Sequence, residues 1–519
     1  MKEKLIRIYR AHRILIIFLG VLTVLRLIYI FLIPLLPQEA YYWYYSLKPD
    51  FSYFDHPPVA AYSIWLGTLI FGNTVFGIKF MGIIWSLLTN ILLYRTALLV
   101  IESGDADERR SWAFIAVIFF NLTLFAHIYA VIIVPDTPLL FFWMSVIFLI
   151  VRFQKTVSLR YLYLAGLALG FGMLSKYTAV AIMPAVFIIL LINKASRKIL
   201  VTPHPYLALL LSAFIFLPVI YWNMENHWVS FGFQFSGRAD ALKSFQTKYI
   251  LQLFASQLFI LTPLPMILFF RTTAVVLKNR LKDTDAVSLM LTGIFIIGGF
   301  LVISLKSLVK MNWLMPGYLG IVVATVLVLK DRISFRSLWI RSGIIASLIL
   351  ILIAYMILLV PNIPLGEGNT WSGWRDAAQK ISDLQSKRGG RKAVFIFTNS
   401  YKASSLLKFY LHDDQEVYAQ NIFGQPALQF DIWGIPDSLS GKNAIYVFSD
   451  RYEYKSQIDS VRRFFNRLKP LTTFEYFFNN QEKTRIISCY FGEGYKKPQT
   501  GPLGSAFNDA SDFPADMRR

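Results

Sequence analysis

The feature that most constrains this chain is a series of apolar runs, each long enough to cross a lipid bilayer. An α-helix needs about 20 mostly apolar residues to span the hydrocarbon core. Apolar residues make up 55% of the 519 residues and charged residues 16%, whereas a soluble domain carries about 25% charged residues. We therefore expect a polytopic α-helical membrane protein with about eleven spans. The expected spans are 14–36, 76–101, 112–132, 137–153, 160–175, 178–193, 205–222, 249–270, 285–304, 312–329 and 341–360.

The placement of Lys and Arg predicts how the spans are oriented. With the N-terminus in the cytoplasm, the cytoplasmic segments carry roughly three times as many Lys and Arg residues as the segments on the other side, which is the positive-inside pattern. An odd number of spans then places the C-terminal region outside the cytoplasm. The same pattern accounts for the net charge of +21, so we expect a lipid bilayer and no nucleic acid as partner.

Two features near the ends of the chain constrain its class further. The basic residues 1–13 run directly into the apolar segment 14–36 without a small-residue cleavage site, so we expect an uncleaved first span. Cys489 is the only cysteine, which excludes an intramolecular disulfide and a cysteine-based metal site.

The composition predicts three parts. Residues 1–360 form a transmembrane core that includes a loop at the outer face, 37–74. Residues 361–498 form a small extracytoplasmic α/β domain, and residues 499–519, rich in Gly, Ser, Asp and Pro, form a flexible tail. The α/β assignment rests on two short apolar strands and two helices. The strands are expected at 392–397 and 444–448, and the helices at 374–385 and 404–411.

Polar residues gather in the segments expected at the outer face. The loop 37–74 contains the sequence PQEAYYWYYSLKPDFSYFDHPP, and two shorter segments carry VPDTP (134–138) and SKYT (175–178). Ionisable groups are costly in lipid, so such clusters indicate a functional site. Aromatic residues such as Tyr42 can line a sugar pocket or form an interfacial belt. The pattern predicts an active site at the boundary between water and lipid.

Seven motifs, in order along residues 30–380, carry a specific resemblance. The chain resembles the phospholipid-carrier-dependent glycosyltransferases with the GT-C fold, which include protein O-mannosyltransferases and the lipid A aminoarabinose and galacturonic acid transferases. The motifs are QEAYYW (38–43), YFDHPP (53–58), VPDTPLLFFW (134–143), GLALGFGMLSKYTA (166–179), WNMENHWVSFGFQ (222–234), KMNWLMPGY (310–318) and GWRDAA (373–378).

The resemblance implies a membrane enzyme. Such an enzyme transfers one sugar from a polyprenyl-phosphate donor to an acceptor at the outer face of the bacterial inner membrane, by single displacement with inversion. The acceptor would be lipid A, another envelope glycan or a protein hydroxyl. No cofactor is implied with certainty, and a divalent cation is left open.

Three carboxylates are candidates for the catalytic group that takes the acceptor proton. Relatives place an Asp-Glu pair after the first span, but this chain has Gln38 and Glu39 there, and Gln cannot take a proton. The role then falls to Glu39, Asp55 or Asp136. Each has a structural alternative: Asp55 and Asp136 stand where they can cap helices, and Glu39 can be a solvated interfacial residue.

Candidate substrate-binding residues are the cations and rings beside these carboxylates. His56 stands where some relatives carry a Lys that contacts phosphate, and it can also be structural or bind a divalent metal with Asp55. Lys176 lies between apolar spans, where it can bind phosphate or extend to the interface. Arg26, inside the first span, is expected to pair within the bundle. The further candidates are Tyr42, Tyr177, Arg238, Lys306 and Lys310; no metal ligand is assigned.

A transporter or flippase that moves a lipid-linked sugar without chemistry is the alternative function. Both classes have many spans. Transporter sites lie near the membrane midplane between repeats, whereas here the ionisable residues gather at the outer boundary and no repeat is visible. The sequence therefore favours the glycosyltransferase.

Overall fold

The computed structural model describes residues 2–239, 246–365, 368–398, 400–411, 415–419, 427–450 and 458–497, with the side chains of 2–9, 235–239 and 459–460 excepted. The tail expected at 499–519 lies outside the described residues. The chain divides into two compact units. The helical unit is Met1–Leu32, His56–Trp228 and Ala241–Tyr355, and the α/β unit is Ile33–Asp55, Val229–Asp240 and Met356–Arg519.

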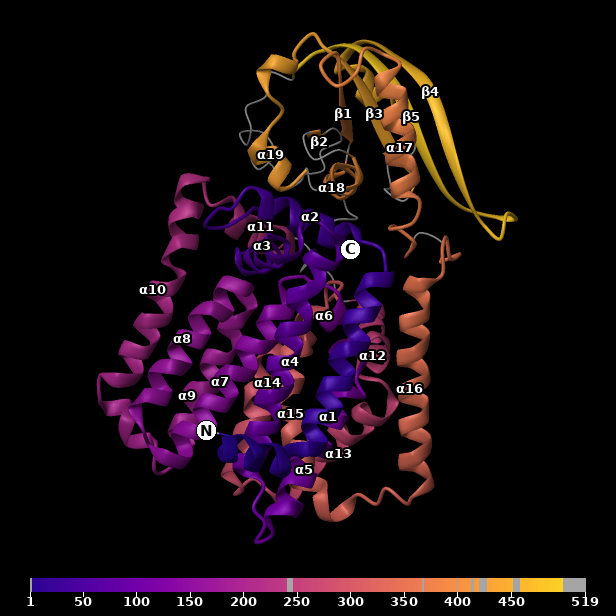
Figure 1. The fold of residues 1–519 in the computed structure, drawn as a ribbon. Coiled ribbons are helices and arrows are strands. Elements are labelled where there is room, and N and C mark those ends of the chain that lie inside the picture. Colours follow the sequence, from indigo (N-terminus) through magenta and orange to yellow (C-terminus); the bar gives the residue numbers. More distant parts are fainter. Residues whose placement is uncertain are drawn as a thin grey trace. The chain divides into compact units, whose positions relative to one another are not determined.

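The helical unit is a bundle of membrane-length and shorter apolar helices (Figure 1). Among the described residues, six helices are long and apolar enough to cross a membrane, and two bent helix pairs raise the number to eight. The long helices are α1 (Lys2–Leu32), α4 (Val75–Val100), α7 (Asp136–Thr156), α10 (His204–Glu225), α14 (Thr284–Ser304) and α16 (Leu338–Leu359). The bent pairs are α5 (Ala106–Asn121) with α6 (Leu124–Val131), and α12 (Thr247–Leu261) with α13 (Pro263–Asn279).

Each of the eleven expected spans coincides with one helix or with two successive helices. That all eleven cross the membrane stays a prediction. Three of the expected spans correspond to shorter helices. They are α8 (Leu159–Ser175), the 3₁₀ helix η1 (Tyr177–Ile182) with α9 (Met183–Ile192), and α15 (Met315–Leu329).

The segment 37–74 differs from the expected loop. It contains α2 (Pro37–Leu47) in the α/β unit and α3 (Val59–Phe71) in the helical unit. Pro37 occupies the first turn of α2, where its missing N–H costs nothing. The density of aromatic residues concealed the helix, because all five residues from Tyr41 to Tyr45 are buried and show no polar face.

The backbone at the bend between α5 and α6 is bonded by side chains. Lipid offers no hydrogen-bond partner, so backbone groups freed at a bend need internal ones. At the 73° bend between α5 and α6, His127 Nε2 lies 2.7 Å from the Asn121 carbonyl oxygen. Thr262, at the second bend, donates to the Leu122 carbonyl. Arg26 donates to Ser86, Asn121 and the Ala126 carbonyl, which confirms its expected pairing inside the bundle.

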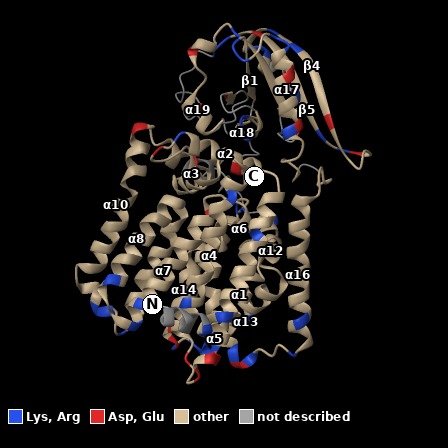
Figure 2. Ribbon diagram, viewed as in Figure 1, with Lys and Arg blue, Asp and Glu red and all other residues tan. Residues whose placement is uncertain are grey.

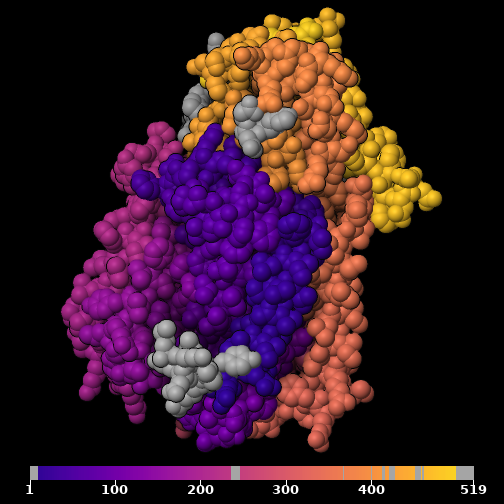
Figure 3. Space-filling view, in the orientation of Figure 1, coloured from indigo at the N-terminus to yellow at the C-terminus, as the bar shows by residue number. Residues whose placement is uncertain are grey.

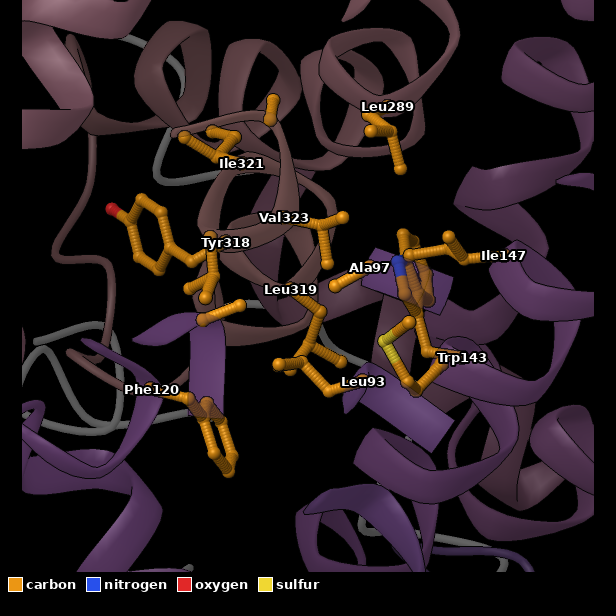
Figure 4. Close-up of a cluster of buried hydrophobic side chains, with 14 of the residues drawn as sticks. Leu93, Ala97, Phe120, Trp143, Ile147, Leu289, Tyr318, Leu319, Ile321 and Val323 are labelled. Carbon is orange, nitrogen blue, oxygen red and sulfur yellow. The ribbon is translucent and has the colours of Figure 1, made fainter. Parts of the chain in front are cut away.

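The core of the helical unit lies around α15, whose residues are all buried. Figure 4 shows its side chains facing those of α4, α5, α7 and α14. Close approach of the helices rests on small residues, as is common in membranes. The labelled core residues are Leu93, Ala97, Phe120, Trp143, Ile147, Leu289, Tyr318, Leu319, Ile321 and Val323.

The outside of the helical unit is apolar along its helices and basic at one end. In the space-filling view, α10 (magenta) and α16 (salmon) form opposite edges of the unit (Figure 3). Phe214 and Leu352 on these helices are 69% and 61% exposed, as suits lipid contact. Lys and Arg gather at the end where α5 begins and α13 ends (Figure 2), the end expected to face the cytoplasm.

The α/β unit contains a five-stranded sheet with the order β2-β1-β3-β5-β4. β1 is parallel to β2 and β3, and β5 is antiparallel to β3 and β4. α17 lies against the sheet (Figure 1), with Gln385 donating to the Val394 carbonyl. The strands are β1 (Val394–Thr398), β2 (Val417–Ala419), β3 (Asn443–Ser449), β4 (Phe465–Phe478) and β5 (Glu482–Tyr495); the helices besides α2 are α11 (Val229–Ala239), α17 (Trp374–Ser386), α18 (Tyr401–Tyr410), α19 (Gln429–Trp433) and α20 (Ile458–Arg462).

The two strands and two helices expected here are confirmed as β1, β3, α17 and α18. The β4–β5 hairpin was not predicted from the sequence. Polar and apolar residues do not alternate cleanly in it, and only scattered positions of β4 are buried.

Replacing Gly293 by Ala is expected to destabilise the helical unit. A Cβ at Gly293 would lie 2.2 Å from the Gly317 carbonyl oxygen, whereas a Cβ at Gly298 on the same helix meets nothing within 4 Å. Overpacking of this kind costs about 1–3 kcal/mol. Thermal unfolding in detergent should show a lower Tm for Gly293→Ala, and for Gly298→Ala an unchanged or higher one. Equal Tm values for the two variants would contradict the close approach of α14 and α15.

Cys489 is expected to be unreactive in the folded protein. Burial raises the pKa of its thiol to about 12, so at pH 8 only about one thiol in 10,000 is the reactive thiolate. A colorimetric thiol reagent should detect no thiol in the native protein and one per chain after denaturation. Rapid labelling of the native protein at pH 8 would show that this part of the sheet opens.

Candidate functional site

Asp55 is held by a chain of buried hydroxyl groups within the α/β unit. The Tyr45 hydroxyl lies 2.5 Å from Asp55 Oδ1 and 2.6 Å from the Tyr41 hydroxyl. A phenol has one proton, so when Tyr45 donates to Asp55, the Tyr41 proton makes the bond between the tyrosines. The backbone N–H of Gln429 donates to the Tyr41 hydroxyl, 3.1 Å away. We call Tyr41, Tyr45 and Asp55 the tyrosine relay.

The two tyrosines of the relay are fixed as neutral donors. Burial, followed by the negative charge of Asp55, raises the pKa of the Tyr45 hydroxyl well above its usual range. Burial also raises the pKa of Tyr41. The Tyr45 ring stacks on Tyr53 at a centroid distance of 4.0 Å. Asp55, only 5% exposed, therefore receives a hydrogen bond from a group that stays protonated at neutral pH.

The backbone around Asp55 is held from two further elements. Gln234 on α11 donates its side-chain N–H to the Asp55 carbonyl, 2.7 Å away. The side-chain oxygen of Gln429 on α19 accepts from the Phe54 N–H at 2.8 Å. Residues from three distant stretches of the chain thus set the position of one carboxylate.

Glu39 and Tyr42 lie on α2. Glu39 is fully buried, and its carboxylate accepts from the Leu36 N–H at 3.1 Å, so it takes part in capping the start of the helix. The alternative of a solvated interfacial Glu39 is therefore wrong. Tyr42 is buried, and its hydroxyl accepts from the Gln38 side chain.

Asp136 forms a second polar cluster, inside the helical unit. Its Oδ1 lies 2.8 Å from the Lys176 ammonium, and its Oδ2 accepts from the Asn312 amide at 3.0 Å. Asp136 and Lys176 are 4% and 8% exposed, so the pair is shielded from water. A carboxylate with both oxygens engaged in this way is suited to orienting Lys176 and Asn312. Lys176 has three ammonium protons and among the described residues bonds only Asp136.

The other expected site residues are distributed over the helical unit. Tyr177 follows Lys176 and packs its ring edge-on against Phe216. Lys306 and Lys310 are exposed, in the segment between α14 and α15, and His56 is half-buried. The side chain of Arg238, on α11, lies outside the described residues.

Several buried polar residues were missed from the sequence. Asn312 stands in the KMNWLMPGY motif, where only the lysine was selected. Lys79 is fully buried within α4; a charged residue five positions into an apolar helix is a signal that the sequence did contain. Tyr41, Tyr45, Gln234 and Gln429 carry no such signal, because nothing local indicates their partners.

The described residues contain no group of three or more His, Cys, Asp or Glu side chains placed to hold a metal ion. Asp55 and His56 are consecutive in the chain and offer one carboxylate and one imidazole as possible metal ligands.

Comparison with known proteins identifies the class of fold. The family model for dolichyl-phosphate-mannose-protein mannosyltransferase matches residues 55–222, a stretch that contains Asp55, Asp136 and Lys176. The crystal structure of ArnT from Cupriavidus metallidurans in the apo state has a TM-score of 0.62 at 13% identity, over 92% of this chain and 98% of that one. The structure of the same protein bound to undecaprenyl phosphate gives 0.62 at 14% identity, over 95% and 99%. The chain therefore has the GT-C fold, as the motifs implied.

A curated relative is similar over part of its length. Lipid A galacturonosyltransferase RgtD from Rhizobium johnstonii is 25% identical over 190 residues, which make up 36% of this chain and 38% of that protein. The chain thus matches less than half of this relative.

Removing Lys176 alone is expected to cost more stability than removing the whole Asp136–Lys176 pair. A buried charge left without its partner costs about 3–5 kcal/mol, whereas neutral replacement of both partners is often tolerated. Thermal unfolding should give Lys176→Met a lower Tm than the double variant Asp136→Asn/Lys176→Met. Lys306→Met, which removes an exposed lysine, serves as the control and should match the wild type. A double variant no more stable than Lys176→Met would contradict the pairing.

Proposed function

We propose that this protein is an integral membrane glycosyltransferase that moves one sugar from a polyprenyl-phosphate donor to an acceptor hydroxyl. The observation that carries the proposal is the mannosyltransferase family match over residues 55–222, because both buried aspartates lie in it. The whole-chain likeness to ArnT supports the fold, and the complex of ArnT with undecaprenyl phosphate supports a polyprenyl-phosphate donor. The similarity to RgtD favours lipid A or another envelope glycan as acceptor over a protein hydroxyl.

The proposed reaction is a single displacement at the anomeric carbon. An acceptor hydroxyl oxygen forms a bond to that carbon, the bond to the phosphate oxygen breaks, and the configuration inverts. The polyprenyl phosphate leaves with the bonding electrons, and the acceptor proton passes to a carboxylate. Group transfer of this kind needs a base and a cation for the phosphate.

In this proposal Asp55 is the base and Lys176 binds the phosphate. Asp55 is buried in the segment that begins the family match, and its carboxylate accepts a hydrogen bond from the neutral Tyr45 hydroxyl. Asp136 instead orients the Lys176 ammonium, whose remaining protons suit phosphate oxygens. Glu39 is assigned to the start of α2. His56, Tyr42, Tyr177, Arg238, Lys306 and Lys310 remain proposed contacts of donor or acceptor.

The proposed setting is the bacterial inner membrane, with the N-terminus in the cytoplasm and the reaction at the outer face. The basic end of the helical unit supports this orientation.

Loss of the gene is expected to change two lipid pools together. Mass spectrometry of envelope lipids should show accumulation of one polyprenyl monophosphate-sugar and loss of the same sugar from lipid A or another glycan. Unchanged lipid pools, together with no sugar transfer by the purified protein, would contradict the enzyme and favour the transporter.

Replacing Asp55 by Asn is expected to abolish transfer while donor binding persists. The amide is nearly the same shape but cannot take a proton, and loss of a general base costs about 10²–10⁴-fold in rate. Single-turnover assays in nanodiscs would measure the rate, with Asp50→Asn as the control because Asp50 is an exposed aspartate in the same segment. Wild-type rates for Asp55→Asn would remove Asp55 from the mechanism.

A further inference from the structure

In the C-terminal part of the chain, Gln429 makes two hydrogen bonds that connect it to Asp55. Gln429, on α19, is 1% exposed. Its side-chain oxygen accepts from the N–H of Phe54, the residue before Asp55. Its own N–H donates to Tyr41, the first member of the tyrosine relay. The same residue therefore reaches Asp55 through the backbone and through the relay.

The packing of α19 keeps Gln429 in this position. Phe430 stacks on Tyr41 with nearly parallel rings and meets Tyr44 edge-on at 5.0 Å. Trp433 packs edge-on against Tyr45. Two side chains of α19 thus contact the helix that carries both relay tyrosines.

The backbone just before Gln429 is held in an unfavourable conformation. Leu428 has φ +54° and ψ −121°, a region that residues with a side chain rarely adopt. Such conformations persist only where the surroundings over-determine them, and they cluster at functional sites. Here the strained residue directs the Gln429 N–H to Tyr41.

We propose that Gln429 is a positioning residue for Asp55, and that the C-terminal part of the chain thereby forms part of the catalytic site. This rests on the proposed function, in which Asp55 is the base. Gln429 reaches Asp55 through Phe54 and through the relay, so its role is to set the direction of the carboxylate and not to transfer the proton.

The variant Gln429→Met tests the inference, because Met has a similar shape and lacks the oxygen that holds Phe54. Gln385→Met is the matched control. Gln385 is also a buried glutamine of the α/β unit, 2% exposed, and its side chain bonds the Val394 carbonyl, away from the Asp55 segment. Both variants lose one buried hydrogen bond, so a general loss of stability affects them alike.

The first readout is independent of catalysis. Hydrogen exchange followed by mass spectrometry should show faster exchange in the peptide that contains Phe54 for Gln429→Met and not for Gln385→Met. Unchanged exchange in that peptide would overturn the inference directly.

The second readout is the split between kcat and KM. Misdirection of a base slows the chemical step, so Gln429→Met should lower kcat about tenfold with the donor KM nearly unchanged. Gln429→Glu, which keeps the accepting oxygen, should restore part of the loss. In the Asp55→Asn background the Gln429→Met change should have no further effect, because the base it positions is absent.

The outcomes separate the two proposals. If the wild type transfers sugar and Asp55→Asn does not, while Gln429→Met behaves like Gln385→Met, the function stands and the positioning role fails. If the wild type transfers no sugar, the proposed function fails, and the exchange result alone then decides whether Gln429 holds the Asp55 segment.

Discussion

The absence of hydrogen-bond partners in lipid is the constraint on which the helical unit depends. Two of its apolar helix pairs bend by 73° and 110°, and each bend frees backbone groups that only protein can satisfy. At the 73° bend, side chains of Arg26 from α1, His127 from α6 and Thr262 between α12 and α13 bond to backbone carbonyls. The same bonds join helices that are distant in sequence. Because α6 leads within four residues to α7, the bend between α5 and α6 also fixes where Asp136 begins its helix.

The two buried aspartates, one in each unit, have different hydrogen-bond partners. Asp136 faces a cation and an amide, whereas Asp55 faces a neutral phenol kept protonated by burial. A carboxylate beside an ammonium is a partner that orients, because its charge is already balanced. A neutral phenol donates a hydrogen bond to a carboxylate and adds no positive charge of its own. The proposed function accordingly gives the two residues different roles.

The sequence predicted those features that local pattern encodes. Apolar runs located the helices, since a span needs a fixed length of apolar residues, and the strands 392–397 and 444–448 were recognisable as buried runs. The motifs identified the GT-C fold. The helix α2 was missed because its aromatic residues are buried on all sides and show no periodicity. Gln429 was missed for a different reason: its partners Tyr41 and Phe54 lie more than 370 residues away, and no local pattern encodes such a distance.

That separation has a consequence for the order in which the protein is made. The ribosome adds about 5–20 residues per second, and Phe54 and Gln429 are 375 residues apart. About 20 to 75 seconds therefore pass between the synthesis of α2 and that of the helix that covers it. During this interval the tyrosines and the tryptophan of α2 have no native neighbours from the C-terminal part. The nascent chain must keep a strongly aromatic segment from associating wrongly, so the Asp55 segment reaches its final form only after most of the chain has been synthesised.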